Sequence, residues 1–142
     1  MAQQILVPVD ASDPSGKAVE YACRHFADAS ITALHVIHPP DVLMGHAQGA
    51  GQAFANPVER GRKDASELLE NASNEARELG VTIETAVRSG NIEPNILTYI
   101  EEHEIDLVII GSHGRSGLAR VALGSVAEKV VRRSPVPVLV VR

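Results

Sequence analysis

The sequence predicts an α/β fold in which helices cover both faces of a parallel β-sheet. Four short runs of apolar, mostly β-branched residues occur along the 142-residue chain. Such continuous hydrophobicity is typical of strands that are buried on both faces, as parallel strands are. Segments with the apolar spacing of helices alternate with these runs, and this alternation favours parallel strands joined by crossover helices.

The apolar runs predict strands at Ile5–Val9, Ile31–Ile37, Leu107–Ile110 and Val136–Val141. A fifth run, Val81–Val87, alternates between apolar and polar side chains. That alternation predicts a half-exposed strand at an edge of the sheet. The sequence therefore predicts five strands in a β-α-β-α-β-α-β-α-β order.

Helical patterns fill the four intervals between these strands. Ser12, with a proline two residues later, predicts the start of the first helix. The second helix carries an apolar stripe that begins at Ala65, and Gly80 ends it. Asn91 predicts the start of the third helix. The fourth helix is Ser125–Arg133, with basic residues in its last turn, where they suit the helix dipole.

Length and composition indicate one domain over residues 1–142 and narrow the classes of function. The net charge is −5 and only 3% of the residues are aromatic, which argues against a nucleic-acid partner. No apolar run approaches the ~20 residues that span a bilayer, and the N-terminus shows no export signal. The single cysteine, Cys23, excludes an internal disulfide and fits a reducing compartment. We therefore expect a cytoplasmic protein that binds neither membrane nor nucleic acid.

One long interval, His38–Pro57, is rich in glycine and proline and precedes the second helix. Loops of this length are usually functional flaps or mobile connections, and the sequence favours neither interpretation over the other.

The segment after the fourth strand carries the main functional signal. Gly111 and Gly114 follow that strand, and Gly124 and Ser125 open the last helix. Glycines let a backbone approach a ligand closely, and the N–H groups at a helix N-terminus bind anions. These parts predict a cradle for a polyphosphate, with Arg115 as a source of positive charge. The alternative is that the glycines only form a tight turn between strand and helix.

The spacing Gly111-x2-Gly114-x9-Gly124-Ser125 resembles the G-x2-G-x9-G-[ST] signature of the ATP-binding universal stress proteins. Three further segments resemble this family at matching places. They are the first strand with its acidic end, Ile5–Asp10, the fourth strand, Asp106–Gly111, and the last strand, Pro135–Val141. The resemblance covers the whole chain and implies a Rossmann-like sheet with the strand order 3-2-1-4-5.

The resemblance also implies an ATP site at the carboxyl ends of the strands. Asp10 would accept hydrogen bonds from the ribose hydroxyls, while Pro8, Val9 and Val36 would line the adenine pocket. The phosphates, with Mg²⁺ as an optional companion, would lie against Gly111, Gly114, Arg115, Gly124, Ser125 and the backbone of Val126. The implied function is a stress-response or regulatory protein whose nucleotide state tunes assembly or partner binding.

Asp10 has an alternative role in capping the first helix, although Ser12 and Asp13 also supply cap oxygens. The sequence offers no Ser-His-Asp or Cys-His arrangement and no Walker lysine. We therefore assign no catalytic residue and no metal ligand. A slow ATP-hydrolysing or nucleotidyl-transferring enzyme is the alternative function.

The last strand, Val136–Val141, predicts a homodimer. It is apolar on both faces and lies at an edge in the implied strand order, and an open apolar edge promotes aggregation. Pairing with the same strand of a second chain would cover it symmetrically. The resemblance points the same way, since many relatives dimerise through this strand. The alternative is that a loop, such as His38–Pro57, covers it instead.

Overall fold

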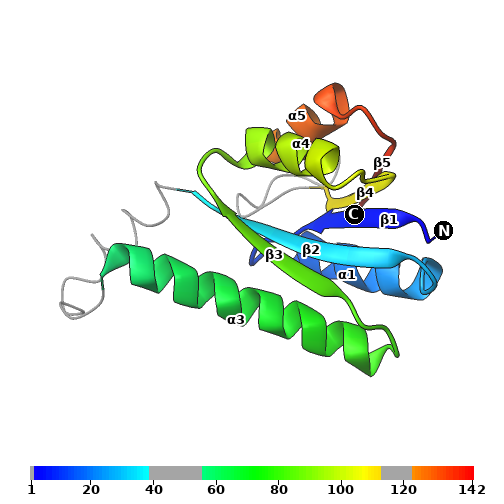
Figure 1. The fold of residues 1–142 in the computed structure, drawn as a ribbon, viewed down its shortest axis with the longest axis horizontal. Helices are drawn as coiled ribbons and strands as arrows, with labels where there is room; N and C mark the ends of the chain where they lie inside the picture. Colours follow the sequence, from blue (N-terminus) through cyan, green and yellow to red (C-terminus); the bar gives the residue numbers. More distant parts are fainter. Residues whose placement is uncertain (1, 39–55, 113–122) are drawn as a thin grey trace.

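The computed structural model describes residues 2–38, 56–112 and 123–142, and these form the predicted α/β fold (Figure 1). Five parallel strands make one sheet in the order β3-β2-β1-β4-β5, which confirms the predicted fold class and strand order. The strands are β1 (Gln4–Pro8), β2 (Ser30–Ile37), β3 (Glu84–Ser89), β4 (Leu107–Gly111) and β5 (Val138–Val141).

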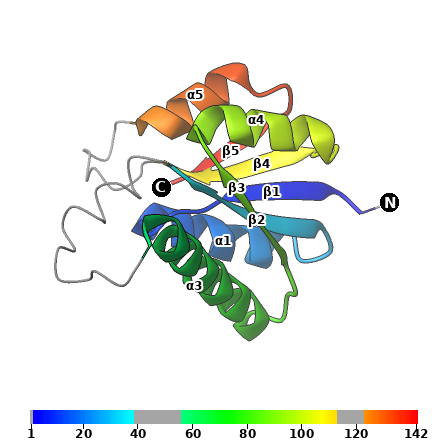
Figure 2. The ribbon, with the colours of Figure 1, turned by 60° about the vertical axis from the view of Figure 1, so that its left-hand side comes forward.

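Helices cover both faces of the sheet, as Figure 2 shows. On one face lie α1 (Asp13–His25) and α3 (Pro57–Glu78). On the other lie α4 (Ile92–Glu102) and α5 (Ser125–Arg133). Right-handed crossovers produce this division. The connections from β1 to β2 and from β2 to β3 run one way along the sheet, whereas those from β3 to β4 and from β4 to β5 run the other way. Because each helix follows a strand of the parallel sheet, each helix starts near the carboxyl ends of the strands.

Alternate residues of β1 enter two separate apolar cores. Ile5 and Val7 pack with α1 and α3, whereas Leu6 packs with α4 and α5. All three side chains have no exposed surface. The predicted burial of this strand on both faces is therefore confirmed, and it holds the end of β1 in a fixed position between the two helical layers.

Two caps explain where the first helices begin. Ser12 caps α1, with its Oγ accepting from the N–H of Ser15 at 3.4 Å. Asn56 caps α3, with its Oδ1 accepting from the N–H of Val58 at 2.9 Å. α3 therefore starts well before Ala65. The predicted apolar stripe begins only at Ala65 because the first two turns of the helix are mostly polar.

Two strands are shorter at their start than predicted. β3 does not include Val81, because the Val81 N–H donates to the Ala76 carbonyl at 2.9 Å and continues the turn that ends α3. β5 does not include Val136. The Ser134 hydroxyl donates to the Val136 carbonyl at 2.7 Å and accepts from its N–H at 3.1 Å, so a local turn precedes the strand.

Cys23 is a buried free thiol in α1, and burial together with the nearby Glu75 carboxylate raises its pKa. In the described ranges, no helix is both long enough and apolar enough to cross a membrane. Of the long His38–Pro57 interval, residues 39–55 lie outside the described residues, and Pro57 is the first residue of α3.

Candidate functional site

A cavity of about 290 Å³ lies at the carboxyl ends of β1, β2 and β4. This is the place where the order of the strands reverses, and open parallel sheets bind ligands there. Eight of the ten predicted site residues line it: Pro8, Val9, Asp10, Val36, Gly111, Gly124, Ser125 and Val126. The other two, Gly114 and Arg115, lie outside the described residues.

The cavity has both an apolar and a polar lining. Leu34 and Val36 come from the end of β2, and Ile92 and Ile96 come from the first turns of α4. Polar groups come from the ends of β1 and β4 and from the starts of α1 and α5. A pocket of this composition suits a ligand that combines an apolar ring with a polar or anionic part.

Asp10 joins the end of β1 to the first turn of α1. Its Oδ1 accepts from the Ser12 N–H at 2.7 Å, and its own N–H donates to Ser15 Oγ at 2.8 Å. Ser15 is only 5% exposed. Asp10 therefore supports the helix cap, as the alternative interpretation expects, and it also lines the cavity. The two roles are compatible, because a carboxylate accepts several hydrogen bonds.

Sequence reasoning missed Ser15 and His35. His35 Nδ1 lies 2.8 Å from the Val9 carbonyl, which only accepts, so Nδ1 carries the proton in this contact. The bond links β2 to the residue that follows β1 and orients the imidazole at the cavity. A sequence signal was present, since His35 directly precedes Val36 at the end of a predicted strand. Within the described ranges, no three His, Cys, Asp or Glu side chains gather to hold a metal ion.

The start of α5 presents backbone N–H groups to the cavity. Gly124 is its N-cap, with φ −66° and no side-chain cap. The Gly124 N–H donates to the Ser112 carbonyl at 2.7 Å, which fixes the helix start against the end of β4. The first-turn N–H groups that follow have no acceptor inside the helix, and Ser125, Val126 and Ala127 line the cavity. An anion would be stabilised here by these donors and by the helix dipole.

Gly111 is a glycine for a packing reason. A Cβ at this position would lie 2.7 Å from the carbonyl carbon of Pro14 and 2.8 Å from its oxygen. The end of β4 therefore contacts the backbone of the first turn of α1 directly. For this glycine the structure supports the turn-and-packing interpretation, and Gly111 lines the cavity as well.

Comparisons with known proteins agree along the full chain. The model of the universal stress protein family matches residues 1–142. Universal stress protein YxiE of Bacillus subtilis is 36% identical over 149 residues, covering 100% of both chains. The structure of universal stress protein UspA from Lactobacillus plantarum has a TM-score of 0.72 at 29% identity, covering 99% of this chain and 97% of that one. A universal stress protein crystallised in complex with cAMP has a TM-score of 0.68 at 26% identity, covering 99% and 96%.

The contact at Gly111 gives a stability prediction. We expect Gly111→Ala to destabilise the fold by about 1–3 kcal/mol, because the added methyl group pushes the start of α1 away from β4. Gly16→Ala is the matched control, since a Cβ there meets no atom within 4 Å. In this helical position alanine should stabilise by about 0.5–1 kcal/mol. Urea unfolding compares the three proteins, and a Gly111→Ala variant as stable as the parent would contradict the close contact.

Proposed function

The chain belongs to the universal stress protein family, and on that premise we propose that it is a nucleotide-binding regulatory protein whose ligand is ATP. The observation that carries the proposal is the cavity, which joins apolar side chains at the end of β2 to the N-terminus of α5, whose cap residue Gly124 has no side chain. A relative of 26% identity was crystallised with cAMP, which supports an adenine nucleotide as the class of ligand.

Each part of ATP has a matching part of the cavity. The adenine ring would lie against Val36, Pro8 and Val9. Asp10 would accept from the ribose with Oδ2, since Oδ1 already accepts from the Ser12 N–H. The phosphates would take the N–H groups of Ser125 and Val126, with Gly111 and Gly124 leaving room beside them. In this proposal Gly114 and Arg115 complete the cradle, and any accompanying Mg²⁺ would be held largely by phosphate oxygens and water.

We further propose that nucleotide occupancy tunes assembly or partner binding in the cytoplasm, where the buried thiol of Cys23 would stay reduced. The alternative is a slow ATP-hydrolysing or nucleotidyl-transferring enzyme. Efficient phosphoryl transfer needs a positioned base or cation at the γ-phosphate. Asp10 would lie at the ribose in this arrangement, which favours binding over hydrolysis.

A homodimer through the predicted Val136–Val141 segment is also part of the proposal. β5 provides residues 138–141 of that segment and lies at one edge of the sheet. Every residue of β5 is partly exposed although all are apolar. Leu139 packs towards one core and Val138 towards the other, so both faces of the strand keep apolar surface for a partner strand.

The first test concerns the phosphates. Gly124→Val places side-chain carbon beside the N-terminus of α5 and should weaken ATP binding at least about 100-fold while the fold remains, because the donors there are shielded. Isothermal titration with ATP measures the change, and Gly16→Ala serves as the control that should bind like the parent. Chromatography of the nucleotide after titration separates stable binding from slow hydrolysis. Equal affinity of the Gly124→Val variant and the parent would place the phosphates elsewhere.

A second test concerns the ribose. Asp10→Ala should weaken ATP binding and reduce the preference for ATP over dATP, because the loss of one partner leaves a polar group unpaired at a cost of about 1–3 kcal/mol. Ser12→Ala removes the cap hydroxyl but keeps the carboxylate, so this control should retain the preference. Competition binding with the two nucleotides measures the ratio. An unchanged ratio in Asp10→Ala would limit Asp10 to its capping role.

The third test concerns the dimer. Light scattering should give a dimer mass for the parent chain. Replacing both Val138 and Leu139 by Glu should give a monomer, because each chain would then bury two carboxylates at the interface, which is costly. Circular dichroism checks that this variant still folds. A monomeric parent chain, or a folded double variant that remains a dimer, would rule out this interface.

A further inference from the structure

The opposite edge of the sheet is formed by β3, and its sequence is self-complementary. Glu84 and Arg88 lie four residues apart on the face of the strand that α4 covers, with Ala86 midway between them. Thr85 and Val87 alternate with them on the α3 face, and Val87 is 41% exposed. In an antiparallel pair of two such strands centred on Ala86, each Glu84 lies opposite an Arg88.

The backbone of β3 is set up for that register. The Gly90 N–H donates to the Ile37 carbonyl at 2.9 Å, so the backbone groups of Arg88 point towards β2 as well. In a parallel pair these directions alternate along the strand, so the N–H and C=O groups of Thr85 and Val87 point away from β2. In an antiparallel pair, two facing residues whose backbone groups point towards each other exchange two N–H···O=C bonds. Thr85 of one copy and Val87 of the other can form such a pair.

We propose that β3 is a second self-association surface, which pairs with β3 of another copy of this chain in antiparallel register about a twofold axis at Ala86. The pairing places two Glu84–Arg88 pairs at non-hydrogen-bonded positions, where facing side chains are closest. It also places two Thr85–Val87 pairs at the hydrogen-bonded positions. Because the same patch serves both chains, the interface is isologous and closes on itself.

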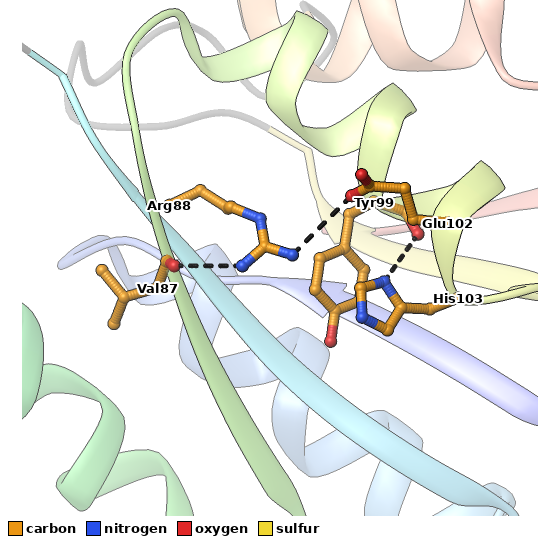
Figure 3. A network of polar contacts seen from close by, with 5 residues as sticks. All are labelled: Val87, Arg88, Tyr99, Glu102 and His103. Atoms are coloured by element: carbon orange, nitrogen blue, oxygen red, sulfur yellow. Dashed lines mark hydrogen bonds and ion pairs between the residues drawn. The ribbon is translucent and has the colours of Figure 1, made fainter.

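Arg88 reaches from β3 towards α4, and Figure 3 shows its guanidinium between the strand and the side chains of Tyr99 and Glu102. Its guanidinium lies 3.5 Å from the outward carbonyl of Val87, 3.7 Å from the Glu102 carboxylate and 5.1 Å from the centre of the Tyr99 ring. The first two contacts are long for an arginine, so they hold the cation near the strand without saturating it. The Arg88 guanidinium can therefore also pair with a second carboxylate, that of Glu84 from the other copy.

A groove beside the edge adds surface to the same interface. A cavity of about 660 Å³ lies between α3 and β3, and Thr85 and Val87 line it together with Leu69. Its walls carry both signs of charge, with Arg62 and Glu70 on α3. A twofold axis through Ala86 brings the α3 helices of both copies to the same face of the extended sheet, so the two grooves would lie next to each other at the interface.

Disulfide trapping tests the register without reference to β5 or to nucleotide. At a non-hydrogen-bonded pair the two Cα atoms are about 4.5 Å apart, within the range that disulfides bridge. Ala86→Cys should therefore form a covalent dimer in buffer with oxidised glutathione, seen on a non-reducing gel. Thr85→Cys is the matched control on the same strand. In the proposed register residue 85 faces residue 87 of the other copy, so the two introduced cysteines lie diagonally across the axis and should link far less. The parent chain controls for Cys23.

Charge reversal tests the partner chemistry. In the Ala86→Cys chain, Glu84→Arg or Arg88→Glu alone should reduce the covalent dimer about tenfold, because both cross-strand pairs become repulsive. Mixing these two single variants should restore it, since every Arg then faces a Glu, and this recovery also shows that both variants fold. Linking of Ala86→Cys no greater than that of Thr85→Cys, or no recovery in the mixture, would overturn the proposal. Neither result depends on ATP binding, which the variants should retain.

Discussion

The candidate site depends on a direct backbone contact between the end of β4 and the first turn of α1. Gly111 and Pro14 approach so closely that no side chain fits between them. Since α1 follows β1 and β1 pairs with β4, this contact places the start of α1 beside the point where the strand order reverses. Ser12 and Ser15 then bond to Asp10. Because Gly111 has no side chain, α1 can lie close enough to β4 to position the polar side of the cavity.

The two helix N-termini on this polar side differ in their electrostatics although the fold places them alike. Around α1, the Ser12 hydroxyl and the Asp10 carboxylate take up backbone N–H groups, and Asp13 adds negative charge to the first turn. At α5 the cap is Gly124, which has no side chain, and the acidic residue of the first turn, Glu128, is exposed and pairs with Arg132 at 3.0 Å. An anionic ligand is thus repelled from α1 and attracted to α5. The different residues at the two caps therefore make the α5 side of the cavity more favourable for an anion than the α1 side.

The sequence predicted those features that depend on local pattern. Ser125–Arg133 is the last helix as predicted. The strand order, which the family resemblance implied, is confirmed. The start of α3 was not predicted, because capping by Asn56 precedes any apolar stripe. His35 was missed for a different reason. Its partner Val9 is distant in the chain, and only the pairing of β2 with β1 brings the two together.

Both edge strands connect through short turns to helices that line the cavity. β3 leads through Gly90 and Asn91 into α4, whose first residue, Ile92, lines the cavity. Gly90 has φ +126°, and the Asn95 side chain donates to the carbonyls of Ser89 and Asn91, so this turn is held firmly. α5 begins at the cavity and leads through one turn into β5. The central strands are buried between two cores and resist displacement, so a ligand that shifts the start of α4 or α5 acts most directly on the edges. The proposed coupling of nucleotide to assembly would therefore need only one turn at β3, and one helix and one turn at β5.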